Sequence, residues 1–117
     1  MTKKMMITIV RSMLAGMVVA ALAVAANAQA RGFAVKIDNF TFNPQQITVR
    51  AGETVVWTNH DDIPHTVTST TMAFRSKALD TDDKFSFTFA APGKYDYFCS
   101  LHPTMTGSIV VEAATGK

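Results

Sequence analysis

The sequence contains few of the residues that often stabilise a small domain or provide it with a reactive site. Its 117 residues include one cysteine, so no disulfide can form within the chain, and only three histidines. There are no internal repeats, no low-complexity stretches and no convincing helical pattern. Charged residues make up 17% of the chain, with eleven basic against nine acidic side chains. These absences exclude a disulfide scaffold and a repeat protein, and they leave one small domain as the expectation.

Residues 1–30 have the features of a secretory signal peptide. Lys3, Lys4 and Arg11 form a basic start, an apolar run follows, and "ANAQA" offers small residues for cleavage after Ala28 or Ala30. The alternative is a membrane anchor, because the apolar run is nearly long enough to span a bilayer. Cleavage is favoured because small residues follow the run directly and no basic stop-transfer cluster comes after it. We therefore expect a periplasmic protein.

Removal of the leader changes the charge of the chain and the partners that it suggests. Three of the eleven Lys and Arg residues lie in residues 1–30, so residues 31–117 carry eight basic and nine acidic side chains. A formal charge near −1 gives no reason to expect nucleic acid or an anionic membrane surface as a partner. We expect residues 31–117 to form a single domain that is monomeric and that does not contact a membrane after cleavage.

Residues 31–117 are predicted to be all-β. The stretch "FAVKIDNFTF" (33–42) alternates as a half-buried edge strand does, and further strands are expected at 47–50, 54–58, 65–70, 85–90, 95–99 and from Gly107 onward. In "FSFTFA", Phe85, Phe87 and Phe89 point to one side. The span 72–84 is expected to be a long loop. Short strands separated by turns predict an antiparallel β-sandwich or barrel.

The single cysteine has two potential metal ligands close behind it. In "YDYFCSLHPTMTG", His102 follows Cys99 by three residues and Met105 follows His102 by three. A thiolate and an imidazole bind copper and zinc, whereas a thioether is a poor zinc ligand and a favourable copper ligand. A bound ion would also occupy a thiol that is otherwise vulnerable to oxidation in an exported protein.

A second imidazole is needed to complete the set, and His65 is the better of two candidates. His65 follows Pro64 at the start of a predicted strand, whereas His60 lies among charges in "NHDD" and is expected to be solvated. The set His65, Cys99, His102 and Met105 is the two-histidine, one-cysteine arrangement with a weak axial methionine that defines a type 1 copper centre. The charged run Asp80–Asp83 is expected to be a solvated turn rather than a calcium loop.

From Phe33 to Ala113 the chain resembles the cupredoxin family, most closely its amicyanin, plastocyanin and pseudoazurin group. Three stretches carry the resemblance: "FNPQQITVRAGETVVWTN", "PHTVTS" and "APGKYDYFCSLHPTMTGSIVVE". The two-residue gaps on both sides of His102 look most like amicyanin. The resemblance implies a Greek-key β-sandwich of about seven to eight strands that binds one type 1 copper per chain.

The resemblance also implies a role for each ligand. His65 would be the buried imidazole, Cys99 the short thiolate bond, His102 the exposed imidazole and Met105 the axial donor. The Pro64 carbonyl could make a fifth, weak contact, and an apolar patch around His102 would be drawn from Pro103, Leu101, Met72 and Pro64. Many members have Asn after the first histidine, where this chain has Thr66, whose hydroxyl is expected to replace part of that bonding.

Four functions compete for such a domain. The first is a one-electron carrier between redox proteins such as a dehydrogenase, a cytochrome or a reductase. The second is a copper chaperone or storage protein, for which Met72 is the only obvious extra donor outside the leader. An enzyme would need a second copper centre, and His60 is the only histidine left for it. A mononuclear zinc site is disfavoured by the thioether. We therefore expect an electron carrier that is not an enzyme.

Overall fold

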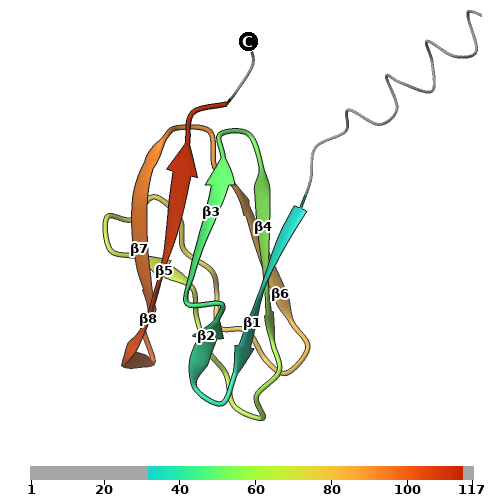
Figure 1. The fold of residues 1–117 in the computed structure, drawn as a ribbon. Coiled ribbons are helices and arrows are strands. Elements are labelled where there is room, and N and C mark those ends of the chain that lie inside the picture. The colour runs from blue at the N-terminus through green and yellow to red at the C-terminus, as the bar shows by residue number, and fades with distance from the viewer. Residues whose placement is uncertain (1–31, 115–117) are drawn as a thin grey trace, which may run out of the picture. The chain divides into compact units, whose positions relative to one another are not determined.

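The computed structural model describes residues 32–114, which form eight strands and no helix (Figure 1). The strands are β1 (Gly32–Asp38), β2 (Thr41–Asn43), β3 (Gln46–Arg50), β4 (Thr54–Asn59), β5 (Thr68–Ser69), β6 (Lys84–Thr88), β7 (Gly93–Cys99) and β8 (His102–Glu112). The signal peptide expected in residues 1–30 lies outside the described residues. Within residues 32–114, the structure contains no helix that is long and apolar enough to cross a membrane.

The strands form two four-stranded sheets. One has the order β2-β1-β4-β6 and the other the order β3-β8-β7-β5. The all-β sandwich is therefore confirmed, but the prediction of an antiparallel arrangement is wrong for two pairs. Strands β1 and β4 run parallel, as do β3 and β8. Alternation within a strand reports which face is buried, not the direction of the neighbouring strand, so the sequence pattern could not reveal these pairings.

The core lies between the two sheets and is rich in aromatic rings. Trp57 of β4 is fully buried and packs against Phe74, Phe85, Phe89 and Tyr97, with ring centroids 5.5–6.5 Å apart. The alternation predicted for 85–90 is confirmed, since the phenylalanines are buried or half-buried while the residues between them are exposed. Cys99 and Met105 belong to the same buried cluster.

The segment 33–42 is two strands rather than one. Asn39 and Phe40 have φ angles of 53° and 58°, and this left-handed turn folds β2 back onto β1. Strand β1 then lies between β2 and β4, so its prediction as an edge strand is wrong. The alternation of apolar residues continues through the turn, which is why the sequence alone suggests one continuous strand.

The segment that begins with His65 is only partly a strand. Strand β5 contains two residues, and His65 instead pairs through an isolated bridge with Leu79. Their backbones exchange two hydrogen bonds, of 3.1 Å and 2.7 Å. The predicted loop over 72–84 is confirmed, because it contains no strand before Lys84. It nevertheless pairs with the residues after His65 and so fixes the backbone of that histidine.

Strands β7 and β8 are joined by a turn shorter than the sequence suggests. Strand β8 begins at His102, not near Gly107, and Cys99 pairs directly with His102 across Ser100 and Leu101. The prediction of a ligand loop extending to Gly107 is therefore wrong. In Figure 1 this turn lies at the same end of the sandwich as the β1–β2 turn and the chain that leaves β4.

Candidate metal centre

Three donor atoms from two distant segments meet at this end of the sandwich. The Sγ atom of Cys99 lies 3.7 Å from Nδ1 of His65 and 3.7 Å from Nδ1 of His102. One ligand atom from each of the three residues lies within 4.8 Å of the other two. Cys99 and His65 are fully buried, whereas His102 is partly exposed. The structure therefore brings these three side chains together, and their role as metal ligands remains a prediction.

The separations between the donors fit a shared metal ion. An ion about 2.3 Å from a sulfur and about 2.0 Å from a nitrogen, with an angle of about 120° between them, places those atoms about 3.7 Å apart. That value matches both sulfur–nitrogen distances, and 120° is the angle of a trigonal site. Met105 lies on β8 three residues after His102, and its side chain is 5% exposed within the core cluster. His65, Cys99 and His102 are arranged to share a single metal ion, and the role of Met105 as a fourth ligand remains a prediction.

A carboxylate that the sequence analysis did not single out fixes the ring of His65. Oδ2 of Asp61 accepts a hydrogen bond of 2.8 Å from Nε2 of His65, which leaves the lone pair of Nδ1 facing Cys99. The Asn39 and Phe40 amides also donate to this carboxylate, at 2.7 Å and 3.0 Å. Metal-binding histidines commonly donate their second nitrogen to such an acceptor. The sequence offered one sign of this contact, which is a carboxylate four residues before His65.

These hydrogen bonds also determine the charge of Asp61. Burial acts to raise the pKa of the Asp61 carboxyl. Hydrogen bonds from the Phe40 amide, from His65 and from the Asn39 amide outweigh burial and lower the pKa below its ordinary value. Asp61 is therefore a stable negative charge beside the imidazole ring of His65.

A group of hydroxyls ties the His65 segment to the Cys99 turn. Thr66 Oγ1 accepts a hydrogen bond of 2.7 Å from the Ser100 amide and lies 2.8 Å from Ser100 Oγ. It also lies 3.1 Å from Oγ1 of Thr68. The Thr66 amide points at Cys99 Sγ, 3.3 Å away, and such a bond stabilises a thiolate. The predicted linking role of the Thr66 hydroxyl is confirmed.

The other residues considered in the sequence analysis do not belong to this cluster of potential ligands. His60 is exposed, as predicted. Asp80 and Asp83 bond to each other's backbone amides, so the run closes a turn of its own, and it is not among the clusters of potential ligands in the described residues. Pro64 is exposed, and the contact of its carbonyl with the metal remains a prediction.

The surface beside His102 is apolar, but its composition differs partly from the expectation. Leu101 is 50% exposed and directly precedes His102. Phe40, which the sequence analysis did not assign to this patch, is 49% exposed, and its ring centroid lies 5.2 Å from that of His102. Met72 is 60% exposed, and its place in this patch remains a prediction. An apolar surface around a partly exposed ligand ring suits a transient protein contact.

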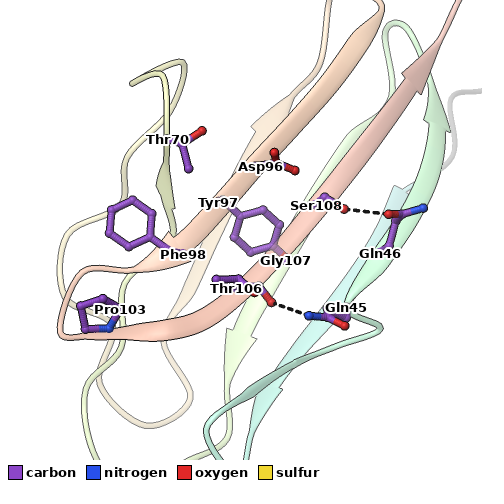
Figure 2. A pocket seen from close by; sticks show the side chains of 10 residues that line it. All are labelled: Gln45, Gln46, Thr70, Asp96, Tyr97, Phe98, Pro103, Thr106, Gly107 and Ser108. Atoms are coloured by element: carbon purple, nitrogen blue, oxygen red, sulfur yellow. Dashed lines mark hydrogen bonds between the residues drawn. The ribbon is translucent and has the colours of Figure 1, made fainter.

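A cavity of about 560 Å³ lies on the outer side of β7 and β8 (Figure 2). Gln45 and Gln46 reach over it, with hydrogen bonds to the Thr106 carbonyl at 3.3 Å and from the Ser108 hydroxyl at 3.0 Å. None of the four donor residues lines this cavity.

Comparison with known proteins agrees with this geometry. The family described as the cupredoxin-like domain matches residues 11–111. An amicyanin from Paracoccus versutus is 37% identical over 93 residues, which cover 75% of this chain and 70% of the relative. Amicyanin-alpha from Methylorubrum extorquens is 34% identical over 103 residues, covering 84% of this chain and 87% of the relative.

Solved structures show the same fold. The Cu(I) form of an amicyanin variant superimposes with a TM-score of 0.67 at 30% identity, covering 75% of this chain and 89% of that one. A purple cupredoxin from Nitrosopumilus maritimus gives a TM-score of 0.65 at 31% identity, covering 68% of this chain and 99% of that one.

Proposed function

We propose that this chain, which belongs to the cupredoxin-like family, carries single electrons between redox proteins on one type 1 copper ion. The ligands in this proposal are His65, Cys99, His102 and Met105. The observation that supports it most strongly is the position of the buried Cys99 sulfur, 3.7 Å from one nitrogen of each imidazole. Copper supplies a one-electron couple when it is bound at such a donor set.

The residues of the chain favour electron exchange by holding the donors in one geometry. The hydrogen bond to Asp61 fixes the ring of His65, and the Thr66 hydroxyl ties the His65 segment to the turn that follows Cys99. The Thr66 amide points at the Cys99 sulfur, 3.3 Å away, and would donate a hydrogen bond to it when the sulfur binds the ion. Because these contacts do not depend on the charge of the ion, gain or loss of an electron requires little movement of the protein.

The ring of His102 provides the exit route in this proposal. It is the only partly exposed residue of the three-donor cluster, and Leu101 next to it presents an apolar side chain to solvent. A dehydrogenase, a cytochrome or a reductase would dock there through a small interface and would exchange one electron with the copper. We further propose that residues 1–30 are a cleaved signal peptide and that the protein acts in the periplasm as a monomer.

The alternative is a copper chaperone or storage protein without a redox role. Such a protein must release its ion readily to a recipient. The deep burial of His65 and Cys99 and the near-complete burial of Met105 favour retention of the ion and therefore favour the carrier. We also propose that the chain is not itself an enzyme, because His60 is the only histidine that remains for a second copper centre.

Electron self-exchange between copies of the protein tests the carrier directly. In a mixture of the Cu(I) and Cu(II) forms, NMR line broadening should report fast exchange at micromolar to millimolar protein concentration. Leu101→Glu places like charges where two copies meet at His102, so exchange should slow at low salt with little change in reduction potential. Thr48→Glu adds the same charge at an exposed position of β3 and serves as the control.

Two results would count against the carrier. The first is slow self-exchange in the wild-type protein, with no effect of Leu101→Glu. The second is rapid transfer of the whole ion to a Cu(I) chelator, which would favour the chaperone or storage function.

A further inference from the structure

The β1–β2 turn contains a residue whose backbone conformation is unfavourable for its side chain. Asp38 pairs with Thr41, so Asn39 and Phe40 form a two-residue hairpin turn in which both φ angles are positive. Glycine is strongly preferred at the second position of such turns, because a Cβ atom is strained in the left-handed region. Phe40 has a φ of 58° there. Strain of this kind persists where the surrounding structure enforces it, often at functional sites.

The ring of Phe40 contacts both imidazoles of the metal centre. Its centroid lies 5.4 Å from that of His65 with an interplanar angle of 84°, and 5.2 Å from that of His102 with an angle of 88°. These are edge-to-face contacts, the favoured geometry for aromatic pairs. Phe40 also lines a cavity of about 200 Å³ together with Thr104 and Met105. Loss of the ring would open this cavity toward the two imidazoles.

The same carboxylate that orients His65 holds Phe40 in place. Asp61 accepts hydrogen bonds from the Asn39 amide, the Phe40 amide and the His65 ring. The Asp61 amide in turn donates to the Asn59 side chain at 2.9 Å, at the end of β4. The turn is therefore anchored to the metal centre through hydrogen bonds, and this anchor maintains the strained backbone.

We propose that Phe40 is a positioning residue of the metal centre, which holds the two imidazole rings and slows the loss of the ion. The inference rests on the proposed copper site, and it extends that proposal to a residue that is not itself a ligand. Loss of two edge-to-face contacts of ordinary strength changes an equilibrium or rate constant that depends on them by about tenfold or more. From this strained turn, the ring of Phe40 reaches both imidazoles.

The test compares Phe40→Gly with Phe40→Tyr in the full-length mature protein. The rate of copper extraction by a Cu(I) chelator should rise about tenfold in Phe40→Gly, because both ring contacts are lost. Phe40→Tyr keeps the ring, so its extraction rate should stay within about twofold of wild type. In the metal-free proteins, Phe40→Gly should not lower the Tm, because relief of the left-handed strain offsets the lost contacts. A purely structural phenylalanine would lower the Tm on removal.

Asp82→Gly is the matched control. Asp82 is another exposed residue with a positive φ, of 71°, and it lies in the turn before β6. Its replacement should relieve the same kind of strain without changing the extraction rate. Equal extraction rates for wild type and Phe40→Gly would overturn the inference, as would a Tm loss in metal-free Phe40→Gly with no change in extraction. If the wild-type protein bound no copper, the proposed function itself would fail, so the two failures are distinguishable.

Discussion

Replacement of Thr66 by valine tests whether one hydroxyl holds the two ligand-bearing segments together. Valine keeps the shape of threonine and retains the backbone amide that points at Cys99 Sγ. It removes Oγ1, which accepts from the Ser100 amide at 2.7 Å and contacts the hydroxyls of Ser100 and Thr68. Thr66 is 7% exposed, so water cannot easily replace the lost oxygen.

The expected cost follows from the groups that are left without partners. An unsatisfied donor that is removed from water costs about 1–3 kcal/mol. The Ser100 amide loses its acceptor, and the hydroxyl of Thr68, which is 6% exposed, loses a neighbour. Ser100 itself is exposed, so its hydroxyl can bond to water. The free energy of unfolding should fall by about 2–3 kcal/mol, which in a domain of this size lowers the Tm by roughly 10–20 °C.

Urea denaturation of the metal-free protein measures this loss without interference from copper binding. Thr48→Val is the control, because Thr48 is an exposed residue on β3 and its replacement should change the free energy of unfolding by less than about 0.5 kcal/mol. If Thr66→Val behaves like this control, the hydroxyl does not link the two segments and the reasoning fails.

Two further predictions concern the axial ligand and the core. Met105→Gln should keep copper bound but lower the reduction potential, because an oxygen donor favours Cu(II); voltammetry should show a shift of about 59 mV for each tenfold change in relative affinity, and an unchanged potential would remove Met105 from the ligand set. Burial raises the pKa of Tyr97 to about 12, so the unfolded chain ionises first, and stability should fall by roughly 2–3 kcal/mol between pH 10 and 12. In denaturation curves, Tyr97→Phe should abolish this loss of stability at high pH. Tyr95→Phe keeps the buried hydroxyl of Tyr97, so the same loss of stability should remain.

The cluster of potential metal donors was predictable from the sequence, because three of the proposed ligands lie within one short segment. The spacing of Cys99, His102 and Met105 restricts them to one strand–turn–strand unit whatever the rest of the fold. His65 was identified by elimination and by its position after Pro64, and the structure brings it to the same point. The β-sandwich was predictable from the alternation of apolar residues, since burial on one face imposes that pattern locally.

The contacts around the donors were not predictable, because they join segments that are far apart in sequence. Asp61 lies in a charged stretch that reads as solvated, yet its carboxylate bonds to a turn more than twenty residues earlier. Phe40 falls in an alternating run, and only the positive φ angles show that the chain reverses there. The parallel pairing of β1 with β4 is likewise a long-range feature that no local pattern encodes.

The most direct test of the account is a visible absorption spectrum recorded during titration of the metal-free protein with Cu(II). We expect one intense thiolate-to-copper band that saturates at one copper per chain, and we expect Cys99→Ser to bind copper without that band. A wild-type protein that stays colourless with one copper bound, while its thiol still reacts with a sulfhydryl reagent, would show that the sulfur of Cys99 and the two imidazoles do not share an ion.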